Sequence, residues 1–257
     1  MSVIFINPYR FAGGSALWTP AAISNVVAWW DASDASSFTF SSGNIVQDWR
    51  SLVGSYTLTQ STSANRPTRS GTVNGLPTVV FDGTNDGLSV ANFNMTAGGQ
   101  RFSLWAVFSS VSGGDRVICE HSSNFNNTSG GFLLARLASN VVSLAKSANA
   151  PSSIYAAFET TDTVTTTPKA FLGFHDGTLS INETSGRLNA STAGTRSPNS
   201  DTNANNVNTT LFVGSRGNSS LYLNGQICEL GFSTSIMTAD EISQLETYLS
   251  QKWALGF

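Results

Sequence analysis

Acidic side chains are the first candidates for chemistry in this chain. Glu120 and Glu229 each stand alone in apolar, strand-like runs, RVICE and ICELGFS. A retaining glycosidase needs two carboxyl groups about 5–5.5 Å apart, and on a strand residues i and i+2 share a face. No strand-like run carries such an acidic pair. Both glutamates are therefore predicted to be structural, at a strand end or beside a satisfying partner.

The two histidines, His121 and His175, do not complete a nucleophilic site either. His121 ends an apolar run, and His175 precedes an Asp-Gly turn signal. No G-x-S-x-G motif accompanies them. Both are predicted to be surface turn residues. The expectation is that the chain has no catalytic residues and is not an enzyme.

Aromatic residues offer a different chemistry, which is stacking on a sugar ring. Trp29 and Trp30 are neighbours in VVAWWD. Successive side chains on a strand point to opposite faces, so one of the two must point away from the core. That residue is a weak candidate for glycan binding. The alternative is that it packs under a terminal helix or an N-terminal arm.

Composition excludes several partner classes. Only 11% of the 257 residues are charged and the net charge is −3, against about 25% charged residues in typical domains. No basic stripe is present, so nucleic acid is not an expected partner. No run approaches the ~18 apolar residues of a membrane helix. Cys119 and Cys228 lie in apolar runs, where two buried free thiols are the prediction and a disulfide is the alternative.

The elements that must position these residues are mostly short strands. Apolar or alternating runs rich in Val, Ile, Leu, Phe and Thr are separated by Gly, Asn, Asp and Ser. This pattern predicts an all-β sandwich or barrel. Strands are expected at 26–31, 76–83, 102–110, 116–120, 131–137, 169–177, 178–183, 210–215 and 227–233. Turns are expected at Asp82-Gly83, Asp86-Gly87, Asp176-Gly177 and Asn224-Gly225, and a long surface loop at 188–208.

One α-helix is predicted at the C-terminal end. Thr238 and Glu241 have the spacing of a capping box. Ile242, Leu245, Leu249 and Trp253 then recur at helical spacing, which predicts an apolar stripe facing the β core. A shorter helical turn is expected from Thr19-Pro20.

Several segments together resemble the concanavalin A-like, laminin-G-type jelly-roll domains. They are AWWDASD, IVQDWRS, NRPT, NGLPTVVFDGTNDGL, LNGQICELGFS and TADEISQLETYLSQKW, and they extend over nearly all of 21–257. The resemblance implies a two-sheet antiparallel jelly-roll sandwich with one C-terminal α-helix packed on it. It says little about function, because this fold serves lectins, enzymes, adhesins and phage structural proteins.

The same resemblance raises the question of calcium, which such domains often bind at a sheet rim. Asp82 and Asp86 in FDGTNDG are the candidate ligands. Calcium takes six to eight oxygen ligands, and the simpler interpretation is that each aspartate caps its own turn. No metal and no cofactor are therefore expected, with calcium kept as a weak alternative. Asp31 and Asp34 are expected to bond backbone amides near the sandwich edge.

The N-terminal stretch SVIFINPYRFAGG resembles segments that open bacteriophage structural proteins. Residues 1–20 are read as an arm and 21–257 as the jelly-roll domain. Within the arm, the candidate virion-docking residues are Ile4, Phe5, Pro8, Tyr9, Arg10 and Phe11. They could add a strand to a neighbouring sheet edge. The alternative is an ordinary first strand of the sandwich.

These observations lead to a first hypothesis and two alternatives. The first is a non-enzymatic phage virion protein that displays the sandwich on a capsid or tail, as a homo-oligomer or in many copies. It would be made in the host cytoplasm without a signal peptide. Its partners would be other virion proteins and, weakly, a host-surface glycan. The second is a carbohydrate-binding lectin module, which needs an exposed aromatic platform on the concave sheet, ringed by Asn, Asp or Arg. The third is a glycan hydrolase.

Overall fold

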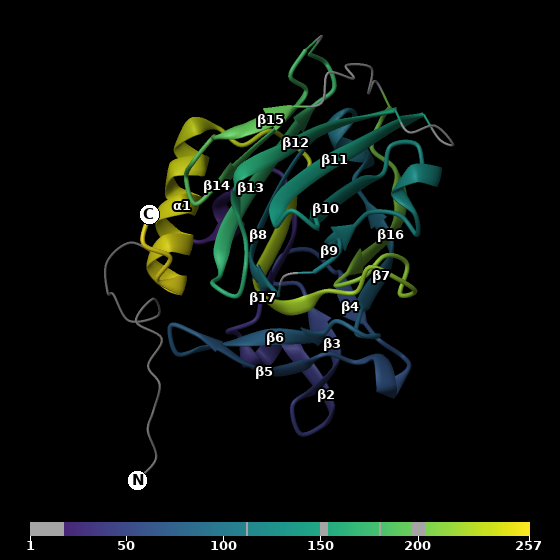
Figure 1. Ribbon diagram of the computed structural model, residues 1–257, viewed down its shortest axis with the longest axis vertical. Coiled ribbons are helices and arrows are strands. Elements are labelled where there is room, and N and C mark those ends of the chain that lie inside the picture. Colours follow the sequence, from purple (N-terminus) through teal and green to yellow (C-terminus); the bar gives the residue numbers. More distant parts are fainter. Residues whose placement is uncertain (1–17, 112, 150–153, 180, 197–203) are drawn as a thin grey trace.

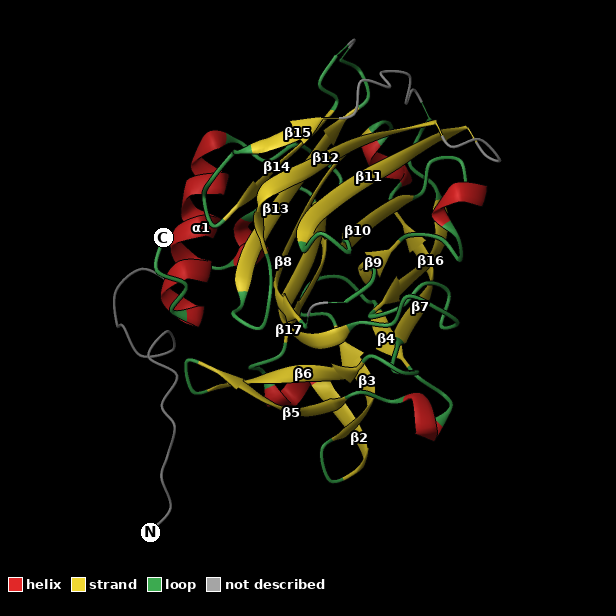
Figure 2. Cartoon of the chain, in the orientation of Figure 1, coloured by secondary structure: helices red, strands yellow, loops and turns green. Residues whose placement is uncertain are grey.

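The computed structural model describes residues 18–111, 113–149, 154–179, 181–196 and 204–257 (Figures 1 and 2). Within them the chain forms seventeen strands. They are β1 Val26–Asp31, β2 Phe38–Ser42, β3 Ile45–Arg50, β4 Thr57–Thr59, β5 Thr68–Val73, β6 Leu76–Asp82, β7 Leu88–Asn94, β8 Arg101–Ser110, β9 Arg116–Glu120, β10 Phe132–Arg136, β11 Val141–Asn149, β12 Ile154–Thr163, β13 Lys169–Asp176, β14 Thr184–Leu188, β15 Gly194–Arg196, β16 Asn208–Val213 and β17 Asn224–Ser233.

The helical elements are few. The one α-helix among the described residues is α1, Ala239–Trp253, and no helix there is long and apolar enough to cross a membrane. Five 3₁₀ turns accompany it, η2 Pro20–Ala22, η3 Ala35–Ser37, η4 Ser63–Asn65, η5 Thr96–Gly98 and η6 Phe125–Asn127. The helical turn expected at Thr19-Pro20 is thus confirmed as η2, and β1 follows shortly after it.

The strands form two layers that close on each other. In the helix-side layer, β14, β13, β8 and β17 pair in that order, and β1 and β6 both pair with β17. The opposite layer runs β4, β7, β16, β9, β10, β11, β12, β15. Strands β6, β5 and β3 connect the two, and all these pairs are antiparallel. The predicted all-β antiparallel jelly roll with one C-terminal helix is confirmed.

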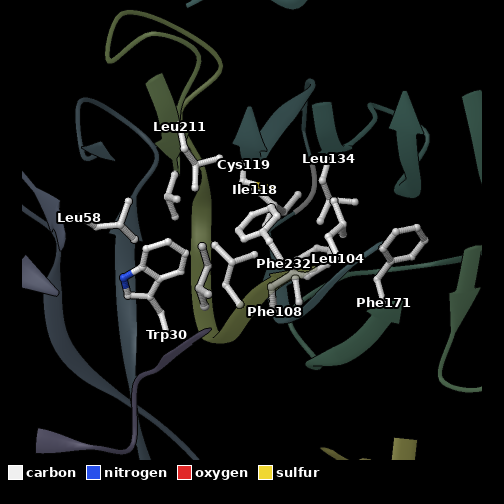
Figure 3. Packing of buried hydrophobic residues seen from close by; sticks show 14 of the residues in the cluster. Trp30, Leu58, Leu104, Phe108, Ile118, Cys119, Leu134, Phe171, Leu211 and Phe232 are labelled. Carbon is white, nitrogen blue, oxygen red and sulfur yellow. The ribbon is translucent and has the colours of Figure 1, made fainter. Parts of the chain in front are cut away.

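The main hydrophobic core lies between the two layers. Figure 3 shows Trp30 and Leu58 toward one end of this cluster, Phe171 at the other, and Phe232 between them. All four side chains are fully buried. Trp30 also donates from Nε1 to the carbonyl of Trp49 at 3.0 Å, so its one polar atom is satisfied inside the core.

A second apolar cluster lies on the outer side of the helix-side layer, under α1. It joins Trp29 of β1 and Trp105 of β8 with Leu245, Leu249 and Trp253 of the helix. The capping box is present, with Thr238 and Glu241 each accepting from the other's backbone amide. The predicted helix and its inward apolar stripe are confirmed, and Trp29 is the neighbour of Trp30 that points away from the main core.

A buried ion network lies at the centre of this helix–sheet interface. Glu229 of β17 accepts from Trp29 Nε1 at 2.8 Å, Trp253 Nε1 at 3.0 Å and Lys252 Nζ at 2.9 Å. Lys252 Nζ also lies 2.7 Å from Asp31 Oδ2. Burial raises the pKa of the Glu229 carboxyl, and the Lys252 ammonium opposes that rise. Two carboxylates therefore share one ammonium under the helix.

Both histidines are fully buried, so their predicted place at the surface is wrong. His121 Nε2 lies 2.8 Å from the carbonyl of Phe93, and His175 Nδ1 lies 2.9 Å from Thr184 Oγ1. They flank the stacked pair Phe102 and Phe132. Burial lowers the pKa of His121 to about 4 and that of His175 to about 3. Both rings are thus neutral core residues at pH 7.

Lys146 of β11 is buried beside the same histidines. Its ammonium donates to the carbonyl of Gly130 and, at 2.8 Å, to Asn206 Oδ1. Asn206 Nδ2 donates in turn to the carbonyl of Arg101 at 2.7 Å. Burial lowers the pKa of Lys146 to about 7. One buried amino group therefore links β11 to the segments around Gly130 and Asn206.

Three local expectations need correction. Residues 178–183, expected to form a strand, belong to the connection between β13 and β14. Asn224 and Gly225, expected in a turn, begin β17, where Gly225 approaches β8 so closely that a Cβ would lie 2.1 Å from the carbonyl of Ser109. The expected loop at 188–208 contains β15. Cys119 and Cys228 are buried free thiols, as predicted.

The ion network predicts a large effect of Lys252→Met. The variant leaves Glu229 buried without its cation, so the free energy of unfolding should fall by about 3–5 kcal/mol. Chemical denaturation followed by tryptophan fluorescence measures it. Lys169→Met is the matched control, since Lys169 has no ion pair within the described residues. Adding Glu229→Gln to Lys252→Met should recover part of the loss. Equal stability of Lys252→Met and the control would contradict this interpretation.

The buried histidines predict a loss of stability in acid. Both have a folded pKa below the unfolded value of about 6.5, so the unfolded chain takes up the proton first and stability falls as the pH drops below about 6.5. Between pH 8 and pH 5, His175 alone should contribute a loss of about 2 kcal/mol. His175→Asn keeps a polar atom near Thr184 and should lose that much less over the same range. Parallel pH profiles for wild type and variant would rule out a neutral, buried His175.

Candidate functional site

A row of side chains crosses the outer face of the opposite layer from strand to strand. Its members are direct register partners of one another: Thr59, Ser89, Phe212, Glu120, Leu133, Ala145 and Ala157. Their sequence neighbours point into the main core, among them Leu58, Leu88, Leu211, Leu134 and Leu144. Since successive side chains on a strand alternate between faces, the row faces away from the core.

Phe212 is the aromatic residue of this row. It is half-buried on β16, opposite Ser89 of β7 on one side and Glu120 of β9 on the other. Its flanking residues Leu211 and Val213 are fully buried in the core. The short β16 is thus fixed by its inner face and presents one large apolar ring on its outer face.

An ion pair lies beside the ring. Arg216 Nε lies 2.9 Å from Glu120 Oε2, and Glu120 Oε1 accepts from the backbone amide of Phe125 at 2.5 Å. Burial raises the pKa of Glu120, and the Arg216 guanidinium counteracts it. The side chain of Glu120 is 0% exposed, whereas that of Arg216 is 18% exposed. The carboxylate therefore orients the guanidinium of a side chain that is partly exposed.

The 214–220 loop brings an amide to the other side of the row. Asn218 Nδ2 lies 3.4 Å from Ser89 Oγ, and its Oδ1 accepts from Ser215 Oγ at 3.1 Å. Its carbonyl accepts from Tyr222 OH at 3.0 Å. The loop lies directly on Gly87, where a Cβ would come within 2.5 Å of Asn218 Oδ1. A glycine at 87 is therefore required for this placement.

The combination suits a polyhydroxylated ligand. An aromatic ring can pack against the C–H face of a sugar, while guanidinium, amide and hydroxyl groups exchange hydrogen bonds with its hydroxyls. Phe212, Arg216, Asn218 and Ser89 supply these groups. The lectin alternative requires an exposed aromatic platform ringed by Asn, Asp or Arg, and the half-buried Phe212 with Asn218 and Arg216 meets this requirement in part. The sequence alone did not identify Phe212, because the side chains of TLFVGS alternate in the same way whichever face of the strand is buried.

The tryptophans proposed for glycan binding do not serve this role. Trp30 is fully buried in the main core and Trp29 is 7% exposed under α1, with its Nε1 bound to Glu229. Neither indole face is open to a ligand. Trp29 packs under the terminal helix, which is the alternative considered for it.

Asp82 and Asp86 form the turn expected from FDGTNDG. Asp82 Oδ1 accepts from the backbone amides of Thr84 at 2.8 Å and Asn85 at 3.2 Å. Asp86 Oδ2 accepts from the amide of Asp82 at 2.9 Å, and burial raises the pKa of Asp86 to about 6. In the described part of the chain, no three His, Cys, Asp or Glu residues come together as a metal site.

The other candidate residues have structural partners or lie outside the described residues. Glu229 and Asp31 both contact Lys252, but they are buried under α1. Asp31 Oδ1 accepts from the amide of Ser33 and Asp34 Oδ1 from that of Ser36, each at 2.9 Å, as expected near the sandwich edge. The arm residues Ile4, Phe5, Pro8, Tyr9, Arg10 and Phe11 lie outside the described residues.

Comparison with known proteins gives similarities of structure only. No protein-family model matches the chain. No curated protein matches it either. Among solved structures, a Trypanosoma rangeli sialidase in complex with 2,3-difluorosialic acid aligns with TM-score 0.55 and 12% identity, over 93% of this chain and 34% of that one. The binding domain of botulinum neurotoxin DC in complex with SialylT aligns with TM-score 0.59 and 10% identity, over 88% and 52%.

This chain therefore spans about a third of the sialidase and about half of the neurotoxin chain. At these identities the similarity concerns the fold. It agrees with the pairing of the strands in an all-β antiparallel jelly roll.

Proposed function

We propose that the chain is a non-enzymatic carbohydrate-binding module that binds sugar on the outer face of the opposite layer, around Phe212. One observation carries the proposal, namely that an outward aromatic ring is flanked by a guanidinium held by a buried carboxylate and by an amide held on a fixed loop. These groups are in place before any ligand arrives, which reduces the loss of side-chain entropy on binding.

The structural neighbours support this direction. The two solved structures above were determined in complexes whose ligands are named as 2,3-difluorosialic acid and SialylT. The absence of catalysis remains part of the proposal. It is supported by the engagement of Glu120 and Glu229 in buried ion pairs, where neither carboxylate is open to a substrate.

A glycan array followed by calorimetry on the best-bound glycan tests the site. Phe212→Ala should weaken binding about tenfold or more, because a central aromatic contact is lost. Asn218→Gly should also weaken it, since glycine tolerates the φ of 53° at this position but carries no amide. Phe40→Ala is the matched control, as Phe40 is a half-buried phenylalanine on β2. If Phe212→Ala binds with wild-type affinity and circular dichroism shows an intact fold, the proposed site is wrong.

Display on a phage capsid or tail is the finer proposal from the sequence, and it rests on the arm at residues 1–20. In that setting many copies of a weak sugar-binding domain would act together on a host surface. The test compares uptake of the full-length protein and of a form starting at Ala21 by purified virions of the suspected phage. Selective loss in the shorter form is expected. Equal uptake of both forms would place the docking surface on the sandwich. If the virions take up neither form, the proposed virion role is contradicted and only the glycan-binding proposal stands.

A further inference from the structure

A small cavity lies on the helix-side layer, away from the Phe212 site. Val80 of β6, Gln226 of β17 and Ser109 of β8 are direct register partners. The neighbouring Phe81, Ile227 and Phe108 point into the main core, so this second row faces outward. The cavity over it has a volume of about 250 Å³ and is lined by Val80, Phe81, Ser109, Val111, Thr166, Asn224, Gly225 and Gln226.

The polar groups of the lining have hydrogen-bonding capacity to spare. Gln226 Oε1 accepts from Thr78 Oγ1 at 2.6 Å, which fixes the orientation of the amide. Within the described residues, no partner contacts Gln226 Nε2 or the side chains of Ser109, Thr166 and Asn224. Two amides of β17, one hydroxyl of β8 and one hydroxyl of the connection between β12 and β13 therefore gather around one space with most of their hydrogen bonds unmade.

The walls of the cavity are held rigidly. Arg136 is fully buried, and its guanidinium donates to the carbonyls of Val111 at 2.8 Å and Gly114 at 3.1 Å and to Ser110 Oγ at 3.1 Å. The amide of Val111 donates to the carbonyl of Asn224 at 2.7 Å, and that of Ser110 to Thr165 at 2.9 Å. A buried arginine thus fixes the segment that ends β8. Val111 is nevertheless 39% exposed, at the rim of the cavity.

The chemistry of the lining defines the ligand class. Among the described residues, no charged side chain contributes to the lining, which favours an uncharged ligand. The volume lies below the roughly 300–1,000 Å³ of drug-sized pockets and suits a single sugar ring. Valine side chains can contact a methyl group, while the amides of Asn224 and Gln226 can pair with another amide. We propose that this cavity is a second binding site, for an uncharged N-acetylated monosaccharide.

This inference stands apart from the proposed function, because the two sites lie on different layers and share no residue. The probe is N-acetyl-D-glucosamine, titrated into the ¹⁵N-labelled full-length protein. Binding with a dissociation constant of about 1 mM is expected for so small a ligand. The amide signals of Ser109, Val111, Gly225 and Gln226 should shift and saturate, and they should do so equally in Phe212→Ala.

Two variants and one ligand control sharpen the test. Gln226→Leu should weaken binding about tenfold. Thr166→Val, at an exposed position where the fold tolerates change, should weaken it about threefold. D-glucose, which lacks the acetamide, should bind about tenfold more weakly than N-acetyl-D-glucosamine. The proposal is overturned if these amides do not shift, if both folded variants bind as the wild type does, or if glucose binds equally well.

Discussion

The buried carboxylate of Glu229 is the interaction on which the architecture depends. It sits in β17, between β8 and β1, and receives the indole N–H groups of Trp29 and Trp253 together with the ammonium of Lys252. A charge in this position is tolerable only because all these donors are present at once. They come from both ends of the described chain, so the network forms only when β1, β17 and α1 are assembled. Because these donors converge on one carboxylate, we infer that the network favours a single orientation of α1 on the sheet.

That orientation decides which surface is left for function. The helix covers the outer face of the helix-side layer, where Trp105, Val107 and Leu172 would otherwise meet water. The outer face of the opposite layer carries no α-helix among the described residues, and its central row includes the half-buried Phe212. A second buried pair, Glu120 with Arg216, works there in the same way as Glu229 with Lys252, but its cation is partly exposed. A buried carboxylate paired with a cation thus holds α1 on one face of the sandwich and orients a candidate binding residue on the other.

Local signals made much of the fold predictable. The capping box at Thr238 and the stripe ending at Trp253 define α1 from sequence alone, and the WWD stretch requires one tryptophan on each face of β1. His121 and His175 were misplaced because a polar residue at the end of an apolar run looks the same whether it caps the run or continues it into the core. Phe212 could not be assigned to a site, since its outward direction depends on pairing with β7 and β9, which are far away in the sequence. The cavity at Gln226 arises likewise from three strands and a distant loop.

The most direct test of the central claim is to locate the bound sugar. A crystal structure, or a chemical-shift map, of the protein with the glycan that it binds best on an array would do so. The account predicts that the sugar ring lies on Phe212, with Arg216 and Asn218 within hydrogen-bonding distance of its hydroxyls. A best-bound glycan that makes no contact with Phe212, Arg216 or Asn218 would contradict it and would reduce the Phe212 row to an ordinary part of the sheet surface.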